Sequence, residues 1–219
     1  MTKVRIPETD HGIQGEVNVS TYDVLQRNLR DKGQIQTKAL IASGISSGHA
    51  LEIGHGPGYL GLEWLKNTQN SWLTGLDISP DMTVLAQKNA REYGLSDRTS
   101  YETGKGNQLP YHDGWFDAVF TNGSLHEWAD PLGTFNEIMR VIKPGGRYFI
   151  SDLRRDMPIY MRWLLWAGTN PKSIRRYMFT SIDAAYTPGE LMEMVKGTNM
   201  HKAEIKGNLI TVTISGSKN

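Results

Sequence analysis

"LEIGHGPGYLG", residues 51–61, is the stretch that decides the fold. An apolar run ends at an acid, Glu52, and a dense group of glycines follows: Gly54, Gly56, Gly58 and Gly61. Glycines placed this densely after a strand let the backbone come close to a ligand. The stretch therefore predicts a strand, a ligand-binding turn and a helix. Its glycines fit two spacings. Gly54, Gly56 and Gly58 form G-x-G-x-G behind an acid, and Gly56, Gly58 and Gly61 form G-x-G-x-x-G, so the identity of the ligand stays open at this point.

The composition is that of an ordinary globular domain. The chain has 219 residues, 38% hydrophobic and 21% charged, with a formal net charge of +1. This length predicts one domain, or one domain with a modest cap. The charge gives no reason to expect nucleic acid or a membrane as a partner. There are no cysteines, which excludes disulfides, thiolate metal ligands and a cysteine nucleophile. The first residues lack the apolar core of a signal peptide, so the cytoplasm is the expected location.

Strands and helices alternate along the chain. Short apolar runs predict strands, and apolar residues three and four apart predict helices. The expected strands are 49–53, 71–79, 99–104, 116–123 and 147–153, and the expected helices are 59–67, 81–95, 130–146 and 187–197. A turn at Gly207-Asn208 predicts a final hairpin. We therefore expect an α/β fold: a Rossmann-like, seven-stranded, mostly parallel sheet with a C-terminal antiparallel hairpin and a helical lid insertion.

This alternation divides the single domain into four parts. They are an N-terminal arm with helices (1–43), a cofactor-binding core (44–152), the lid insertion (153–186), and a C-terminal helix and hairpin (187–219). Within the first part, residues 1–20 are polar and are expected to lack firm structure, and residues 21–43 predict a helix interrupted at Gly33. Ligands of parallel sheets bind at the carboxyl ends of the strands, where the glycine turn and Asp77 lie.

A nicotinamide cofactor is one interpretation of the glycine turn. Asp77 ends the second strand 21 residues after Gly56, the spacing at which an acid holds the ribose of a dinucleotide. Tyr101 and Lys105 also have the spacing of the proton-transfer pair of short-chain dehydrogenases. That pair needs one helical face, whereas the residues around Lys105 are predicted to be a strand that runs into a glycine-containing loop.

S-adenosylmethionine is the other interpretation, and it explains more of the residues. Glu52 stands next to the turn, where it can accept from the ammonium group of a bound amino acid, directly or through water. The two negative charges of a dinucleotide's pyrophosphate would be repelled by an adjacent acid. Asp77 would then hold the two ribose hydroxyls through charge-assisted hydrogen bonds.

Four blocks between residues 49 and 152 resemble the class I S-adenosylmethionine-dependent methyltransferases, and most closely their ubiquinone/menaquinone-type small-molecule branch. The blocks are "LEIGHGPGYLGLEWL", "LTGLDISPDM", "LPYHDGWFDAVFTNGSLHEWADP" and "FNEIMRVIKPGGRYFISDL". The resemblance implies that the methionine part is held by Glu52, Gly54, Gly56 and Gly58, with Asn122 near it. It implies that Asp77 holds the ribose and that Ile78 and Met82 flank the adenine.

One position departs from the family pattern. The family usually has an Asp before Leu109-Pro110 that accepts from the adenine amino group, and Lys105 occupies that place here. An ammonium group cannot accept a hydrogen bond. We expect the block Lys105, Gly106 and Asn107 to face the adenine edge, with Asn107 or a backbone carbonyl as the acceptor.

Methyl transfer from a sulfonium needs little from the protein beyond alignment. The leaving thioether is neutral, so a general acid is unnecessary, and a base is needed only if the acceptor carries a proton. His126 and Glu127 follow the fourth strand near the expected methyl position and are the candidates for that base. The alternative is that His126 only caps the next helix and packs the loop. The six histidines show no clustered ligand spacing, so no metal site is expected.

The lid insertion is rich in aromatic and basic residues. Tyr160, Trp163 and Trp166 are spaced three apart, which places them on neighbouring positions of a helix. They suggest an apolar cover over a small, flat acceptor, or simply packing of the lid. The basic residues fit an anionic group on the acceptor, a solvated face or, less well, RNA; they are Arg154, Arg155, Arg162, Lys172, Arg175 and Arg176.

The sequence therefore predicts a methyltransferase that acts on a small-molecule acceptor. Two alternatives stay open: a nicotinamide-dependent oxidoreductase, and a module that binds S-adenosylmethionine without catalysis. The acceptor, the atom methylated and the oligomeric state are not set by the sequence.

Overall fold

The structure is a computed structural model that describes residues 4–8 and 11–219. Residues 1–3 and 9–10 of the expected arm lie outside the described residues. The strands are β1 (Gly48–Ile53), β2 (Ser71–Asp77), β3 (Thr99–Thr103), β4 (Phe116–Asn122), β5 (Ile142–Leu153), β6 (Glu204–Gly207) and β7 (Thr211–Ser217). The helices are α1 (Glu16–Asp31), α2 (Thr37–Ala42), α3 (Tyr59–Lys66), α4 (Pro80–Tyr93), α5 (Pro131–Val141), α6 (Ile159–Gly168), α7 (Arg175–Ala184) and α8 (Pro188–Lys196). Short 3₁₀ turns are η1 (Ser96–Arg98), η2 (Leu125–Glu127) and η3 (Lys172–Ile174).

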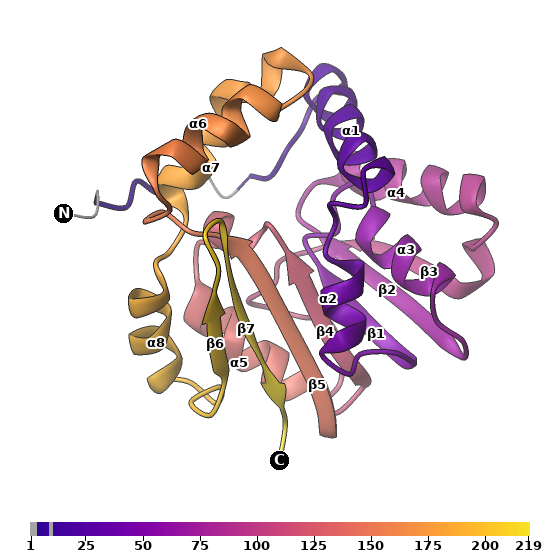
Figure 1. Cartoon of the computed structure of the whole chain (residues 1–219). Helices are drawn as coiled ribbons and strands as arrows, with labels where there is room; N and C mark the ends of the chain where they lie inside the picture. Colours follow the sequence, from indigo (N-terminus) through magenta and orange to yellow (C-terminus); the bar gives the residue numbers. More distant parts are fainter. Residues whose placement is uncertain (1–3, 9–10) are drawn as a thin grey trace.

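All seven strands form one sheet in the order β3-β2-β1-β4-β5-β7-β6 (Figure 1). The pairs from β3 through β5 are parallel, and β7 pairs antiparallel with both β5 and β6. The strand order reverses between β1 and β4, which makes their carboxyl ends the switch point of the sheet. The predicted fold class is thus confirmed, including the terminal hairpin at the far edge.

Each face of the sheet has its own hydrophobic core, and neighbouring residues of a strand alternate between them. In β1, Ala50 packs with Leu60 and Trp64 of α3, whereas Leu51 packs with Phe135 of α5. The first core joins the sheet to α2, α3 and α4, and the second joins it to α5 and α8. This alternation also decides on which side of the sheet Glu52 lies.

Local signals in the sequence set several helix ends. Ser79 caps α4, since its Oγ accepts from the Met82 amide at 3.2 Å, and Gly94 ends that helix with φ of 67°. Thr187 and Glu190 form a reciprocal capping box at the start of α8. These hydroxyl and carboxylate groups satisfy amides that a helix leaves unpaired at its first turn.

Two expected boundaries were wrong. Structure begins before residue 21, because the Gly15 amide donates to Asp81 Oδ2 at 2.8 Å and α1 starts at Glu16. Helix α5 ends at Val141 rather than near residue 146, since Ile142 is already extended and pairs with Phe116. The residue before a proline disfavours the helical conformation, so Lys143, which precedes Pro144, continues that extended path.

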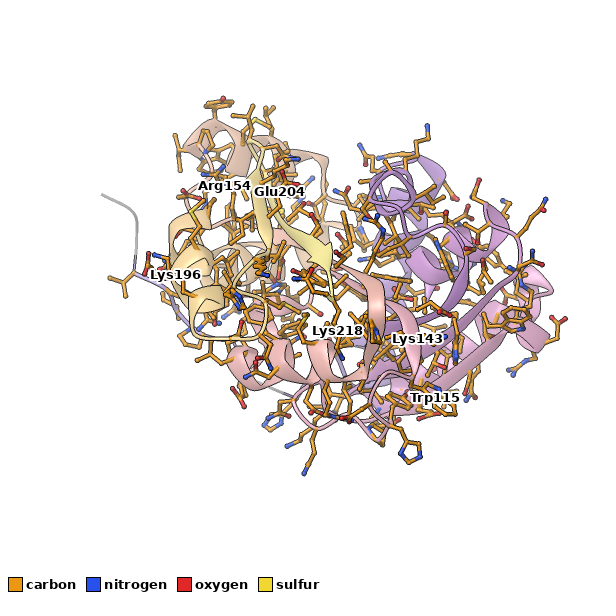
Figure 2. The ribbon with its side chains drawn as sticks, turned by 90° about the horizontal axis from the view of Figure 1, so that it is seen from below. Trp115, Lys143, Arg154, Lys196, Glu204 and Lys218 are labelled. Carbon is orange, nitrogen blue, oxygen red and sulfur yellow. The ribbon has the colours of Figure 1, made fainter. Side chains whose placement is uncertain are left out.

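The lid inserted between β5 and α8 forms an arch above the sheet, with α6 and α7 at its top (Figure 1). No residue of α6 is buried. Trp163 is 58% exposed, although its ring contacts Trp166 and Phe179 edge-on. The opposite end of the sheet, at the amino ends of β4 and β5, carries Trp115 and Lys143. Figure 2 shows this end from below.

Replacing Gly61 with alanine should destabilise the fold. A Cβ at this position would lie 2.3 Å from Leu73 Cδ2 and 2.4 Å from Glu52 Oε2. We expect Gly61→Ala to lower the free energy of unfolding by about 1–3 kcal/mol, the usual cost of overpacking, as measured by denaturant titration. Gly189→Ala in α8 is the matched control, because nothing lies within 4 Å of its added Cβ. Equal stability of the two variants would contradict this packing.

Candidate functional site

A cavity lies at the carboxyl ends of β1, β2 and β4, the switch point of the sheet. Its lining combines residues from five segments of the chain: Gly12, Ile13, Tyr22, Ile53, Gly54, Gly56, Leu76, Asp77, Ile78, Met82, Gly104, Lys105, Gly106, Asn107, Gly123, Ser124, Glu127, Trp128, Ala129, Asp130 and Thr134. We call this space the donor cavity. Most of the predicted cofactor-binding residues lie in it.

Asp77 is the fixed point of the donor cavity. Its Oδ2 accepts from the Gly56 amide and its Oδ1 from the Ser79 amide, both at 2.9 Å. The carboxylate therefore holds the glycine turn and the start of α4 together. A carboxylate has about four lone-pair sites, so both oxygens keep accepting capacity for a pair of ligand hydroxyls.

The glycine turn uses conformations that other residues rarely adopt. Gly54, Gly56 and Gly58 have φ values of 67°, 51° and 84°. A Cβ on Gly54 would also lie 2.5 Å from the Cβ of Ser124. The G-x-G-x-G spacing is therefore required by the backbone of the turn, whereas Gly61 lies inside α3 and is required by side-chain packing.

Glu52 does not line the donor cavity. Alternation along β1 turns its side chain to the face covered by α3, where the Gly61 amide donates a hydrogen bond to the carboxyl group and Oε2 has no hydrogen-bond partner among the described residues. Burial is the main cause that raises the pKa of Glu52 to about 8, and nearby Asp77 adds to it. Gly58 lies against Tyr101. Neither Gly58 nor Asn122 is part of the cavity lining.

The residues predicted around the adenine all reach the donor cavity. Ile78 and Met82 line it from the start of α4, and Lys105, Gly106 and Asn107 line it from the loop after β3. Lys105 is the one cation among the cavity-lining residues. The pair Tyr101 and Lys105 does not share a helix, because Tyr101 is buried in β3.

The N-terminal arm supplies lining residues that sequence reasoning missed. Gly12 and Ile13 lie over the end of β2, where Ser79 Oγ donates to the Ile13 carbonyl at 2.6 Å. Tyr22 of α1 reaches the cavity next to Gly56. No spacing signal connects these residues to a motif more than 30 positions away, so only the tertiary structure could reveal them.

His126 is buried beside the cavity and is held by Asp152. Its side chain is 5% exposed, and its Nδ1 lies 2.9 Å from Asp152 Oδ2, which also accepts from the His126 amide at 2.8 Å. Burial alone would lower the pKa of this imidazole, but Asp152 outweighs it and holds the pKa well above its usual range. His126 does not line the donor cavity.

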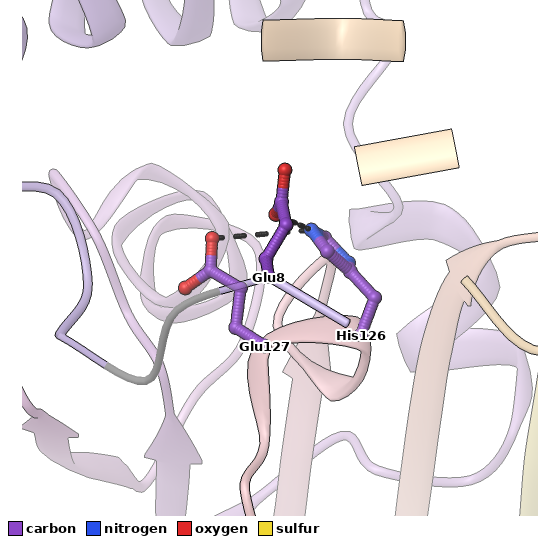
Figure 3. A group of neighbouring side chains, drawn as sticks. All are labelled: Glu8, His126 and Glu127. Carbon is purple, nitrogen blue, oxygen red and sulfur yellow. Dashed lines mark ion pairs between the residues drawn. The ribbon is translucent and has the colours of Figure 1, made fainter. Parts of the chain in front are cut away.

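Two carboxylates face the other nitrogen of His126 (Figure 3). Nε2 lies 3.4 Å from Glu8 Oε2 and 3.9 Å from Glu127 Oε1. The arm delivers Glu8 because Arg5 donates to the His126 carbonyl and stacks over Tyr186. Burial raises the pKa of Glu127 to about 7. Of the predicted catalytic pair, Glu127 borders the donor cavity and His126 lies behind it.

Residues 51–150 match the family model described as "Methyltransferase domain". The segment from β1 to β5 is therefore similar to methyltransferase domains. This match covers the glycine turn, Asp77 and the segment that carries Glu127, so the predicted resemblance to S-adenosylmethionine-dependent methyltransferases is confirmed as a similarity.

Two curated relatives show how far the similarity extends. The methyltransferase GfsG of Streptomyces halstedii is 31% identical over 57% of this chain and 45% of its own length. The demethylmenaquinone methyltransferase of Deinococcus radiodurans is 33% identical over 60% of this chain and 55% of its own length. The chain thus spans about half the length of these relatives.

A solved structure from Methanococcus maripaludis resembles the whole chain. It has a TM-score of 0.74 at 22% identity, and the match covers 100% of this chain and 97% of that one. The similarity therefore extends beyond the sheet to the arm and the lid, at the level of the fold. In the part of the chain that the structure describes, no helix has both the length and the apolar character that crossing a bilayer requires.

The raised pKa of Glu52 predicts a pH-dependent stability. Between its ordinary value of 4.5 and about 8, the folded chain keeps a proton that the unfolded chain releases. Stability should therefore fall as pH rises through this range, by at most about 1.4 kcal/mol per pH unit. Glu52→Gln should flatten this slope, while Glu193→Gln on the exposed face of α8 should leave it unchanged. Parallel profiles for the wild type and Glu52→Gln, measured by denaturant titration, would contradict the assignment.

Proposed function

We propose that this chain transfers the methyl group of S-adenosylmethionine to a small-molecule acceptor. The observation that carries the proposal is Asp77, a carboxylate fixed by the Gly56 and Ser79 amides with accepting capacity left for two hydroxyls. It stands at the switch point of a sheet whose residues 51–150 match a methyltransferase family.

The donor would lie along the carboxyl ends of the strands. Asp77 would accept from both ribose hydroxyls, and the adenine would lie between Ile78, Met82 and the loop 105–107. The methionine part would lie against Gly54 and Gly56. Glu52, Gly58 and Asn122 would support this turn from behind, since they stay outside the cavity lining.

The chemistry would be an in-line displacement. The acceptor atom forms a bond to the methyl carbon while the carbon–sulfur bond breaks, and its electron pair stays on a neutral thioether. The protein would contribute alignment and exclusion of water. Glu127 and Trp128 line the cavity and would face the acceptor, and His126 would act as a positioning residue behind Glu127.

The lid favours a flat, apolar acceptor over an anionic one. Most of its arginines already have protein partners: Arg162 pairs with Asp183, Arg154 with Asp156, and Arg155 with Glu190. Arg175 donates to two backbone carbonyls and stacks over Trp166. Tyr160 and Trp163 of α6, in contrast, are 54% and 58% exposed. We also propose a cytoplasmic location, because a chain without cysteines has no disulfides that would need an oxidising compartment.

Asp77→Ala should weaken S-adenosylmethionine binding by about 1.5–3 kcal/mol, roughly 10- to 150-fold, because two charge-assisted bonds are lost. Calorimetry measures this directly. Asp77→Asn, which keeps an acceptor for one backbone amide, separates the loss of charge from disorder of the turn. Asp97→Ala, on the exposed 3₁₀ turn η1, is the control. Unchanged affinity in Asp77→Ala would remove this residue from the ribose.

Binding and turnover together distinguish the three candidate functions. The purified protein should bind S-adenosylmethionine and S-adenosylhomocysteine in calorimetry, with no signal from NADH. Methyl-labelled donor should then label a hydroxyl- or thiol-bearing aromatic compound in a screen of acceptors. Binding of NADH alone would support an oxidoreductase, and donor binding without any transfer would support a module that only binds the donor.

Trp163→Ala in the lid should raise the KM for the acceptor by about 10- to 100-fold, the contribution of one buried aromatic side chain. The affinity for S-adenosylmethionine should stay the same, because no residue of α6 lines the donor cavity. Trp115→Ala is the matched control, since this tryptophan is 50% exposed at the other edge of the sheet (Figure 2). Equal KM values in the two variants would contradict a role of the lid in acceptor binding.

A further inference from the structure

We infer that Glu8, His126 and Glu127 form a binding site for one divalent transition-metal ion next to the donor cavity. The three side chains offer one imidazole nitrogen and two carboxylate oxygens, which all lie within 4.8 Å of one another. They come from two segments, the N-terminal arm and η2, which meet only in the folded chain (Figure 3). Sequence spacing alone therefore gave no reason to expect a metal.

The distances around Nε2 are long for charge-assisted hydrogen bonds and are compatible with a shared ion. A charge-assisted bond between an imidazole and a carboxylate is about 2.7–2.9 Å long, but Nε2 lies 3.4 Å from Glu8 and 3.9 Å from Glu127. Two ligand atoms that are each about 2.1 Å from one tetrahedral ion lie about 3.4 Å apart. The spacing of the donor atoms therefore leaves room for a shared ion.

The surroundings of His126 resemble those of a metal ligand. Asp152 binds Nδ1 through both carboxylate oxygens, at 2.9 and 3.0 Å, and this fixes Nδ1 as the donor. Nε2 thereby faces Glu8 and Glu127. In the metal-free chain it carries the proton that the raised pKa of His126 retains, and a bound ion would replace that proton. A carboxylate behind a histidine in this way orients the ring and strengthens it as a ligand.

The donor set selects the class of metal. One imidazole and two carboxylates suit Zn²⁺, Mn²⁺, Fe²⁺ or Co²⁺ better than Mg²⁺ or Ca²⁺, which prefer oxygen ligands throughout. Three protein ligands leave at least one coordination position open, as in catalytic rather than structural sites. Since Glu127 also lines the donor cavity, the ion would lie beside the space where the acceptor binds.

A consequence for the acceptor class rests on the proposed function. A hydroxyl or thiol of the acceptor that coordinates the ion would release its proton to bulk water more easily. Its lone pair would then form the bond to the methyl carbon as the carbon–sulfur bond breaks towards the thioether. The site would thus favour acceptors that present an oxygen or sulfur atom to a cation.

Metal titration of the tag-free, metal-stripped chain tests the site. We expect calorimetry with Zn²⁺ to show one ion per chain. Bound Co²⁺ should give the visible absorption bands of a four- or five-coordinate ion. Glu8→Gln and Glu127→Gln should each weaken Zn²⁺ binding at least tenfold. His112→Asn, at an exposed histidine near Trp115, should bind as the wild type does.

Circular dichroism and thermal unfolding test whether each variant is folded. If Glu127→Gln does not fold, the Zn²⁺ affinity of Glu8→Gln alone tests the site. The absence of Zn²⁺ binding at 100 µM, unchanged affinity in a folded glutamine variant, or loss of binding in His112→Asn would overturn the metal site. Calorimetry with S-adenosylmethionine on the same samples keeps the two proposals apart. Donor binding without Zn²⁺ binding rejects only the metal site, and Zn²⁺ binding without donor binding rejects only the proposed function.

Discussion

The double hydrogen bond of Asp77 is the interaction on which the site depends. One carboxylate receives the Gly56 amide from the turn after β1 and the Ser79 amide from the start of α4. Two segments that follow neighbouring strands are thereby fixed relative to each other before any ligand binds. Such preorganisation lowers the entropic cost of binding. The arm continues the same arrangement, because Ser79 and Asp81 in turn hold the backbone at Ile13 and Gly15.

The alternation of β1 explains how one short motif serves two purposes. Leu51 and Ile53 belong to the core under α5, while Ala50 and Glu52 face α3. Glu52 thus supports the glycine turn from the far side, through the Gly61 amide, and does not reach the cavity. The last glycine of the G-x-G-x-x-G spacing is explained by this packing, and the pattern that suggests a dinucleotide arises here without a pyrophosphate.

Charge is concentrated where the arm meets η2. Three carboxylates, those of Glu8, Glu127 and Asp152, surround the single imidazole of His126 in a largely buried position. Arg5 anchors the arm at this place through the carbonyls of Ala184 and His126. The arm therefore closes one side of the donor cavity and also completes the group of side chains beside it, while α6 of the lid has no buried residue.

The sequence by itself determined the sheet, its alternating helices, the glycine turn and the position of Asp77. These follow from short-range patterns: apolar periodicity, glycines in a turn and polar residues at strand ends, each readable within a few residues. The resemblance to a known family placed Ile78, Met82 and the block 105–107 around the adenine, which agrees with the rule that ligands bind at the carboxyl ends of parallel strands.

Only the tertiary structure decided which face of β1 carries Glu52, where α5 gives way to β5, and how Gly12, Ile13 and Tyr22 reach the cavity. The same holds for the meeting of Glu8 with His126, which are separated by more than 100 residues. Contacts of this kind depend on how the arm packs against α7 and η2, and no local pattern records that packing. The fold and the donor site thus follow from patterns within a few residues of the sequence. The group formed by Glu8, His126 and Glu127 depends on contacts between distant segments.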